Sequence, residues 1–341
     1  MAQSPRTRIQ DVAALAGVSI KTVSRVMNDE PGVRSDTGQR VRAAMNSLNY
    51  QPSLHARSLA GKRSHLLGLI YENPSPNYVY EIQSGAMTKC REAGFRLIVQ
   101  SCNDLGDTLI AEAIAMAEQT HIDGLIVTPP LSSNRDLIAA LDARALPFVR
   151  IAPDEVPHSS PLVEIDDEAA ARAITAHLLG LGHRRIGFIA GHPDHYSSRV
   201  RLAGYCAELL SRGIDCDALP REQGYNDYAS GREAALRMLG RVDRPTAIFA
   251  SNDDMAAGLI AAAHALGLDV PGELSVAGFD DTQLAGIVWP TLTTIHQPTR
   301  EMSFTAAELL IDLISGEDPP PSRRLDFRLI VRGSTAELSD R

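Results

Sequence analysis

The sequence is poor in cysteine and contains no long apolar run. Its 341 residues include 4 cysteines, which form no CxxC pair and no His/Cys set with zinc spacing: Cys90, Cys102, Cys206 and Cys216. We therefore expect buried or inert thiols, no disulfide scaffold and no metal site. No stretch approaches the roughly 18 apolar residues of a membrane span, so we also expect no membrane partner.

The amino terminus lacks the apolar segment of a signal peptide. Arg6, Arg8, Gln10 and Asp11 lie where that segment would be, so we expect the protein to stay in the cytoplasm. Hydrophobic residues make up 44% and charged residues 22%, a composition that excludes collagen and disorder. At roughly 150 residues per domain, the length predicts two or three compact units.

The charge is divided unevenly along the chain. Residues 1–65 carry ten Lys or Arg and four Asp or Glu, a net charge of +6. Because the whole chain has a net charge of −9, the other 276 residues carry −15. A basic amino-terminal part joined to an acidic body is expected if only that part binds a polyanion such as DNA. A solvated basic surface is the simpler alternative.

The first 50 residues predict a helix-turn-helix. Ile9, Val12, Ala13 and Ala16 recur at helical spacing, and Gly17 allows the chain to leave this first helix. Ser19 is a suitable N-cap for a second short helix, which turns two valines inward. A third helix is expected at 35–48. The second helix of such a motif fits the major groove of double-stranded DNA.

The exposed face of the second helix carries residues suited to reading bases. Lys21 and Arg25 lie one turn apart, and Arg is the usual bidentate reader of guanine. Ile20 is hard to explain as solvated surface, but it could contact a thymine methyl. These three residues make DNA binding the favoured interpretation of the motif.

The segment RIQDVAALAGVSIKTVSRVMN at 8–28 resembles the headpiece of the lactose-repressor (LacI/GalR) family of bacterial transcription regulators. Arg8 stands where that family usually has Thr. The resemblance implies that Ile20, Lys21 and Arg25 read bases. It also implies that four neighbours touch phosphates or hold the helix: Ser19, Thr22, Ser24 and Asn28.

Residues 49–60, NYQPSLHARSLA, resemble the hinge of the same family. Pro52 favours the start of a helix, which is too short to be stable alone, so folding on DNA is expected. The resemblance implies DNA contacts by Ala56, Arg57 and Leu59, with Leu59 wedged into the minor groove. A plain linker with Leu59 packed on the body is the alternative.

From residue 65 onward, short apolar runs alternate with helical patterns. Such runs include LLGLIY at 66–71, RRIGFIAG at 184–191 and TAIFAS at 246–251. This alternation predicts parallel sheets covered by helices on both faces. The number of strands fits two lobes, with a break near 154–162 and further crossovers near 290 and 320.

The body resembles the periplasmic-binding-protein-like core of the LacI/GalR family. The similar segments include GHRRIGFI at 182–189, RLAGY at 201–205, ASNDDMA at 250–256, VAGFDD at 276–281 and LTTIHQP at 292–298. The expected fold is thus α + α/β: an N-terminal helix-turn-helix headpiece at 1–50, a hinge helix at 51–63 and a two-lobed α/β core at 64–341. The first lobe would comprise about 64–158 and 291–320, and the second about 162–288 and 321–335.

A ligand between the lobes would meet the carboxyl ends of parallel strands. Asn252 and Asp280 follow two such strands, and the resemblance implies that they contact an effector together with Arg201 and Gln297. Capping of the following helices is the alternative for Asn252 and Asp280. Further candidates, at the rim or elsewhere in the pocket, are Asn73, Asn77, Tyr78, Arg150, His195 and Asn226, the last replacing a family aromatic.

An enzyme and a transport protein are the rival interpretations. The stretch LGLGHRRIG lacks the third glycine of a dinucleotide fingerprint and precedes its strand, and we find no supported catalytic constellation. A transport-type binding protein would share the body but not residues 1–63. We therefore expect a regulator without catalytic activity or cofactor, a repressor acting as a homodimer on a palindromic operator. Its effector is expected to be a small polar molecule, a mono- or disaccharide being favoured.

Overall fold

The structure, a computed structural model, describes residues 7–27, 32–50, 63–102, 108–154, 159–316 and 321–338. The chain forms two compact units, one of residues 1–66 with 121–123 and the other of residues 67–120 with 124–341. We call the described residues 7–50 the headpiece and the second unit the core. Asn28, Ala56, Arg57 and Leu59, four of the expected DNA contacts, lie outside the described residues.

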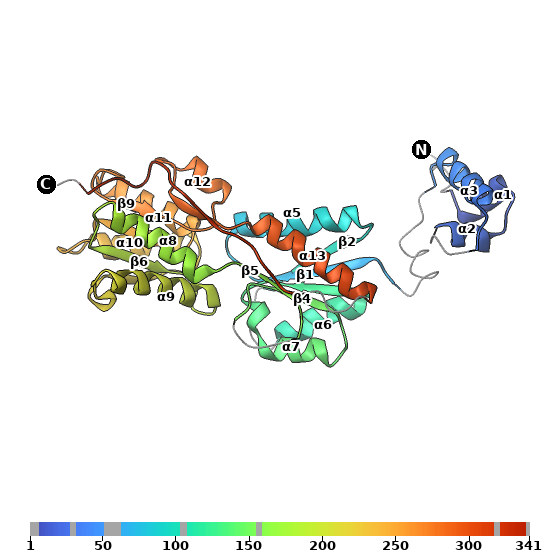
Figure 1. Cartoon of the computed structure of the whole chain (residues 1–341), viewed down its shortest axis with the longest axis horizontal. Coiled ribbons are helices and arrows are strands. Elements are labelled where there is room, and N and C mark those ends of the chain that lie inside the picture. Colours follow the sequence, from blue (N-terminus) through green and yellow to red (C-terminus); the bar gives the residue numbers. More distant parts are fainter. Residues whose placement is uncertain are drawn as a thin grey trace. The chain divides into compact units, whose positions relative to one another are not determined.

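The headpiece contains the three predicted helices: α1 (Ile9–Ala16), α2 (Ile20–Met27) and α3 (Ser35–Ser47). Gly17 ends α1 with a φ of 63°, the left-handed conformation that its lack of a side chain permits. The small hydrophobic core gathers Val12, Val23 and Val41, all fully buried. The predicted helix-turn-helix is confirmed (Figure 1).

The first lobe of the core is built on a six-stranded sheet. In sheet order its strands are β11 (Arg323–Arg324), β5 (Leu162–Glu164), β4 (Phe148–Ile151), β3 (Gly124–Val127), β1 (Leu66–Tyr71) and β2 (Arg96–Ser101). Strands β11, β5, β4, β3 and β1 run parallel. Helices α5 (Pro76–Glu92) and α13 (Thr299–Ser315) pack together on one face. Helices α6 (Thr108–Thr120) and α7 (Arg135–Asp142) lie on the other, with η1 (Leu131–Ser133) before α7 (Figure 1).

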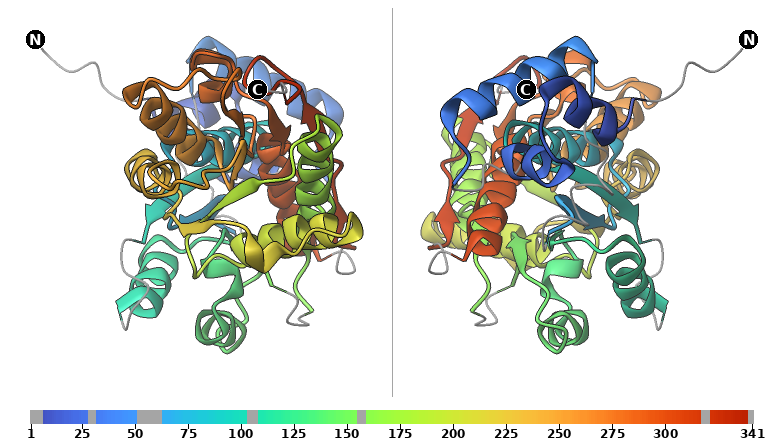
Figure 2. Two further views of the ribbon diagram at one scale, coloured as in Figure 1. Left: turned by 90° about the vertical axis from the view of Figure 1, so that its left-hand side faces the viewer. Right: turned by 90° about the vertical axis from the view of Figure 1, so that its right-hand side faces the viewer.

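The second lobe has a four-stranded parallel sheet. Its order is β7 (Arg221–Gln223), β6 (Ile186–Ala190), β8 (Ala247–Ala250) and β9 (Ser275–Ala277). The surrounding helices are α8 (Asp167–Gly180), α9 (Tyr196–Ser211), α10 (Tyr228–Leu239), α11 (Asp253–Ala265) and α12 (Gln283–Ile287). Figure 2 (left) shows how they enclose the strands. Two parallel sheets wrapped by helices confirm the predicted α/β core.

The chain crosses between the lobes at places that differ from the predicted limits. Residues 162–164 and 323–324, assigned from sequence to the second lobe, form β5 and β11 in the sheet of the first lobe. Residues 293–296, assigned to the first lobe, bridge instead to Ala277 and Asp280 in the second lobe. There β10 (Thr294–His296) pairs with β12 (Arg328–Ile330). The three-residue β5 and the two-residue β11 lack the continuous apolar runs that reveal the other strands.

Two of the four cysteines differ from the expectation of buried or inert thiols. Cys206 near the end of α9 and Cys216 in η2 (Cys216–Ala218) form a disulfide, with their Cα atoms 5.2 Å apart. Gly213, at a φ of 72°, lies in the turn between these two elements. Cys90 and Cys102 are buried free thiols, and burial raises the pKa of each to about 11. In the described segments no helix is both long and apolar enough to span a membrane.

Candidate DNA-binding and effector-binding sites

Ser19 fixes the start of α2 as the sequence predicts. Its Oγ accepts a hydrogen bond from the Thr22 backbone N–H at 3.1 Å and lies 2.9 Å from Thr22 Oγ1. Val23 and Val26 face the headpiece core. Because these two residues fix the rotation of α2, Ile20 and Lys21 lie on its exposed side, with Ile20 45% exposed.

Arg25 lies closer to the rest of the headpiece than Lys21 does. Its side chain is half-buried, and a Cβ added at Gly32 would lie 3.1 Å from its Nη2. Gly32 has a φ of 93°, which favours glycine and lets the backbone approach the guanidinium. Ser24 is also half-buried. The exposed end of α2 therefore presents Ile20 and Lys21 most openly.

One small cavity brings together most of the expected effector residues from both lobes. Eight of the ten line it: Asn73, Tyr78, His195, Arg201, Asn226, Asn252, Asp280 and Gln297. We call it the cleft cavity. Its volume is about 40 Å³, whereas small-molecule pockets usually measure roughly 300–1,000 Å³. The two lobes therefore leave little free space at this point of the cleft.

Arg201 is the centre of the polar network in the cleft cavity. Its Nε donates to Asp167 Oδ1 at 2.7 Å, its Nη1 to the Ser251 carbonyl at 2.7 Å and its Nη2 to Gln297 Oε1 at 3.0 Å. Nη1 also lies 3.6 Å from Asp280 Oδ1. The guanidinium stacks on the Phe279 ring, 3.5 Å from its centroid. These contacts hold the Arg201 side chain in one orientation.

Burial disfavours the charged form of the carboxylates in the cleft. It raises the pKa of Asp167 and raises the pKa of Asp280 well above its usual value, although Arg201 opposes both shifts. Asp253, which lies beside Asp280 at the start of α11, has its pKa raised to about 7 by burial. The guanidinium of Arg201 thus faces more than one carboxyl group, so a further negative charge at this site is unfavourable.

The helix-capping alternative holds for Asn252 but not for Asp280. The Asn252 Oδ1 accepts from the Met255 backbone N–H at 2.9 Å and so caps α11, while its Nδ2 donates to the Asn226 carbonyl at 2.9 Å. Helix α12 begins after Thr282, so Asp280 does not cap it. The φ of Asp280 is 110°, an unfavourable conformation for a residue with a side chain.

Two expected effector residues do not line the cleft cavity. Asn77 acts instead on the carboxylate of Asp254, whose pKa it lowers against the effect of burial. The buried Arg150 lines a separate cavity of about 260 Å³ beside α7, and its Nε donates to Ser160 Oγ at 3.0 Å. Ala152, just after the strand, lines the cleft cavity instead.

The sequence interpretation missed five residues that line the cleft cavity: Ser75, Pro129, Ala152, Asp167 and Ser197. Pro129 and Ala152 follow β3 and β4, and Asp167 follows β5 at the start of α8. Their position at the carboxyl ends of parallel strands is the signal that could have identified them.

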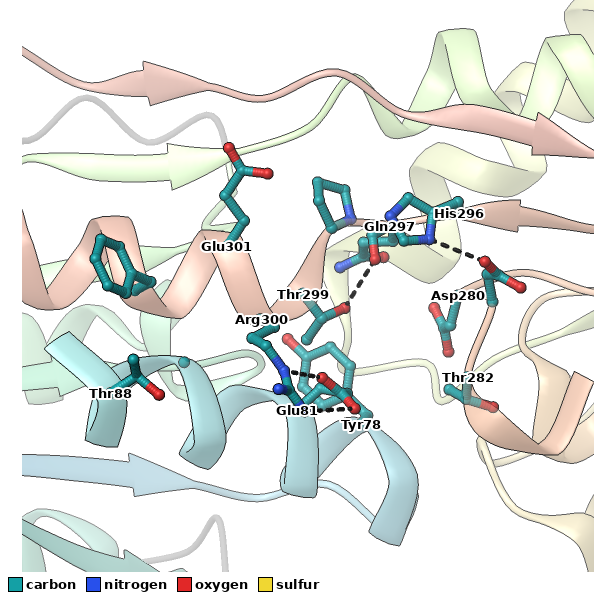
Figure 3. A pocket seen from close by; sticks show the side chains of 14 residues that line it. Tyr78, Glu81, Thr88, Asp280, Thr282, His296, Gln297, Thr299, Arg300 and Glu301 are labelled. Carbon is teal, nitrogen blue, oxygen red and sulfur yellow. Dashed lines mark hydrogen bonds and ion pairs between the residues drawn. The ribbon is translucent and has the colours of Figure 1, made fainter.

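A larger cavity of about 550 Å³ lies against the cleft cavity and shares Tyr78, Asp280 and Gln297 with it (Figure 3). Residues 78–88 of α5 and the start of α13 line it. Across it Arg300 forms an ion pair with Glu81, with Nε 2.7 Å from Oε2. In the described ranges no group of three His, Cys, Asp or Glu side chains is arranged to hold a metal ion.

A helix-turn-helix headpiece joined to a two-lobed core with a polar cleft defines a DNA-binding regulator controlled by a small molecule. A family model for bacterial regulatory proteins of the lacI family matches residues 8–53, and one for a periplasmic binding protein-like domain matches residues 175–335. The transcriptional repressor PurR of Photobacterium profundum is 34% identical over 337 residues, 97% of this chain and 99% of the relative. The chain belongs to the lacI family of bacterial regulatory proteins.

Other relatives support this assignment. The ribose operon repressor of Escherichia coli is 32% identical over 330 residues, 96% of this chain and 99% of that protein. The structure of the Lac repressor bound to ONPG in the repressed state has a TM-score of 0.82, 31% identity and coverage of 96% and 99%. The CelR–cellobiose complex has a TM-score of 0.74, 31% identity and coverage of 96% and 100%. The relatives named here are transcription regulators and not enzymes, and this chain is accordingly a DNA-binding transcription regulator with an effector-binding core.

Proposed function

We propose that two copies of this chain bind a palindromic operator and repress transcription, and that a mono- or disaccharide in the cleft cavity controls this binding. A homodimer presents two copies of α2, which match two half-sites of an operator with the same two-fold symmetry. The dimeric Lac repressor bound to its operator, 31% identical to this chain, supports this arrangement.

In this proposal α2 provides the base contacts. Ile20 and Lys21 lie on its exposed side, and Arg25 follows one turn later. Ser19, Thr22, Ser24 and Asn28 contact phosphates or support the helix. Ala56, Arg57 and Leu59 contact DNA from the hinge at 51–63, with Leu59 in the minor groove. Movement of the lobes acts on the DNA through this hinge.

The observation that carries the effector assignment is the convergence of eight expected side chains from both lobes on one cavity. Hydroxyl, amide, carboxylate and guanidinium groups in such a setting offer paired donors and acceptors for the hydroxyls of a sugar. The names of two relatives, the ribose operon repressor and the CelR–cellobiose complex, support a sugar as the effector. Because the cleft cavity is nearly closed, binding and lobe movement are coupled, which is the requirement for control at a distance.

The test is a fluorescence anisotropy titration of full-length protein on its selected operator, repeated with ribose, glucose, lactose and cellobiose. At least one sugar should change operator affinity by about 5–150-fold, the usual range of such coupling. The direction of the change shows whether the sugar induces or corepresses. Operator affinity that no sugar changes would contradict the effector assignment and leave DNA recognition standing.

A further inference from the structure

Two buried polar atoms from opposite lobes lie within ion-pair distance of each other but make no hydrogen bond. They are Oε2 of Glu72, which follows β1, and Nε2 of His195, which precedes α9. The atoms are 3.5 Å apart, longer than the roughly 2.7–2.9 Å of a good charge-assisted hydrogen bond. Ser132 Oγ is the one other such atom among the buried side chains that the structure describes.

An unsatisfied buried polar group is destabilising, so a pair of them points to a molecule that binds between them. The His195 side chain is 3% exposed and lines the cleft cavity. The Glu72 side chain is 25% exposed and lies beside it. An oxygen about 2.8 Å from both atoms is geometrically possible because they are only 3.5 Å apart.

The charge of the surroundings restricts which molecule fits. Glu72, Asp167 and Asp280 bring three carboxyl groups to this side of the cleft. The opposing cation is Arg201, and each of its three nitrogens already donates to an oxygen of the protein. Three of its five N–H groups are therefore in use, and its charge is shared with Asp167 and Asp280, which weakens its attraction for a ligand carboxylate or phosphate.

The chemistry of the pair selects among ligand groups. A carboxylate or phosphate only accepts, and it would face the Glu72 carboxylate. Where Nε2 of His195 carries the ring proton, an ammonium group, which only donates, leaves that N–H without an acceptor. A hydroxyl in the same place accepts from Nε2–H and donates its own proton to Glu72 Oε2, so it satisfies both atoms at once.

We propose that Glu72 and His195 form a specificity site where a hydroxyl of the effector bridges the two lobes, so that neutral polyhydroxy ligands bind and their anionic counterparts are rejected. This inference rests on the proposed sugar-responsive function and adds Glu72 to the residues that determine it. Since the two residues belong to different lobes, the same hydroxyl also favours lobe closure.

The test compares matched neutral and anionic ligands by isothermal titration calorimetry on the full-length protein. Suitable probes are ribose with ribose 5-phosphate, glucose with glucuronate and glucose 6-phosphate, and cellobiose with cellobionate. At least one neutral sugar should bind, and its anionic counterpart should bind at least tenfold more weakly. In Glu72→Gln the neutral sugar should bind more weakly than in the parent. The difference in affinity between the neutral and the anionic ligand should shrink, because the variant no longer repels the anion through the Glu72 carboxylate.

Glu118→Gln is the matched control, because it removes a carboxylate from an exposed position in the same lobe. Its ligand selectivity should equal that of the parent, and thermal denaturation checks the folding of both variants. An anionic probe that binds the parent as tightly as its neutral counterpart would overturn the inference but leave the sugar function intact. Parent-like selectivity in Glu72→Gln would also overturn it. Binding of no probe at all would overturn both the sugar function and the bridge that depends on it.

Discussion

Ser75, in the first lobe, donates a hydrogen bond from its hydroxyl to the carboxylate of Asp254 in the second lobe. Ser75 is the N-cap of α5, and Asn77 in the first turn of that helix lowers the pKa of the same carboxylate. Asp254 is 7% exposed, and burial raises its pKa. The contact joins the N-terminus of a long helix to an acid across the cleft, where the helix dipole favours negative charge. It therefore stabilises the closed arrangement of the lobes.

Ser75→Ala should move the lobes towards an open arrangement. The substitution removes a hydrogen-bond donor from the buried Asp254 carboxylate, which destabilises the closed arrangement by about 1–3 kcal/mol. The ratio of open to closed molecules should therefore rise about 5–150-fold. Small-angle X-ray scattering should show a larger radius of gyration than in the parent. Ser211→Ala, which removes a hydroxyl at the end of α9, is the control. Identical scattering from Ser75→Ala and the parent would show that this bond does not hold the lobes together.

Arg25→Ala should relax sequence preference at one position of each operator half-site. Loss of one bidentate base contact costs about 1–3 kcal/mol. Arg40→Ala removes the same charge from the exposed side of α3 and should weaken binding to every sequence equally. Binding selections with the two variants separate these outcomes. If both variants select the parental sequence with the same stringency, Arg25 is not a base reader.

Asp280→Ala should abolish the response to the effector and leave operator affinity without effector unchanged. The carboxylate lies beside Arg201 in the cleft cavity and is not needed to cap α12. Anisotropy titrations with and without the effective sugar measure both quantities. Asp217→Ala, on the exposed surface of the same lobe, should respond like the parent. A normal response in Asp280→Ala would remove Asp280 from the effector site.

The free energy of unfolding of the core should depend on pH because of Asp253. This carboxylate accepts from Thr294 Oγ1 at 2.7 Å and from the Thr282 backbone N–H at 2.8 Å. Burial raises its pKa to about 7, above the value of about 3.9 expected in the unfolded chain. Between these values the folded state holds a proton that the unfolded state has released. The free energy of unfolding should therefore fall as the pH rises from about 4 to about 7.

Asp253→Asn removes this proton site and tests the effect. The stability difference between parent and variant should shrink by up to about 1.4 kcal/mol per pH unit across that window, and level off above it. Urea denaturation at several pH values, followed by circular dichroism, measures this difference. A difference that stays constant with pH would mean that Asp253 titrates alike in both states.

The elements that the sequence predicted well are those with a strong local signal. Gly17 and Ser19 mark the turn and the start of α2, and buried valines at helical spacing define the helices around them. The apolar runs locate β1, β6 and β8 for the same reason. Arg201, Asp280 and Gln297 also converge as the family resemblance implied, because they lie at the strand ends and crossovers where parallel sheets form clefts.

The features that the sequence did not predict depend on how distant segments meet. The bond between Cys206 and Cys216 requires that the chain turn back after α9, which ten residues of spacing do not reveal. Arg150 is buried in its own cavity beside α7, which the pattern of its strand does not show. Glu72 gains its significance from His195, a residue of the other lobe, so its place after β1 was a weak signal alone.

A binding selection on randomised duplex DNA, at two salt concentrations, tests the central claim most directly. The account predicts enrichment of a palindrome with two half-sites and a flexible central step, which persists at the higher salt concentration. Specific contacts to bases survive where phosphate attraction weakens. Weak binding without sequence preference that disappears at higher salt would contradict it, because charge alone would then explain the affinity of the headpiece for DNA.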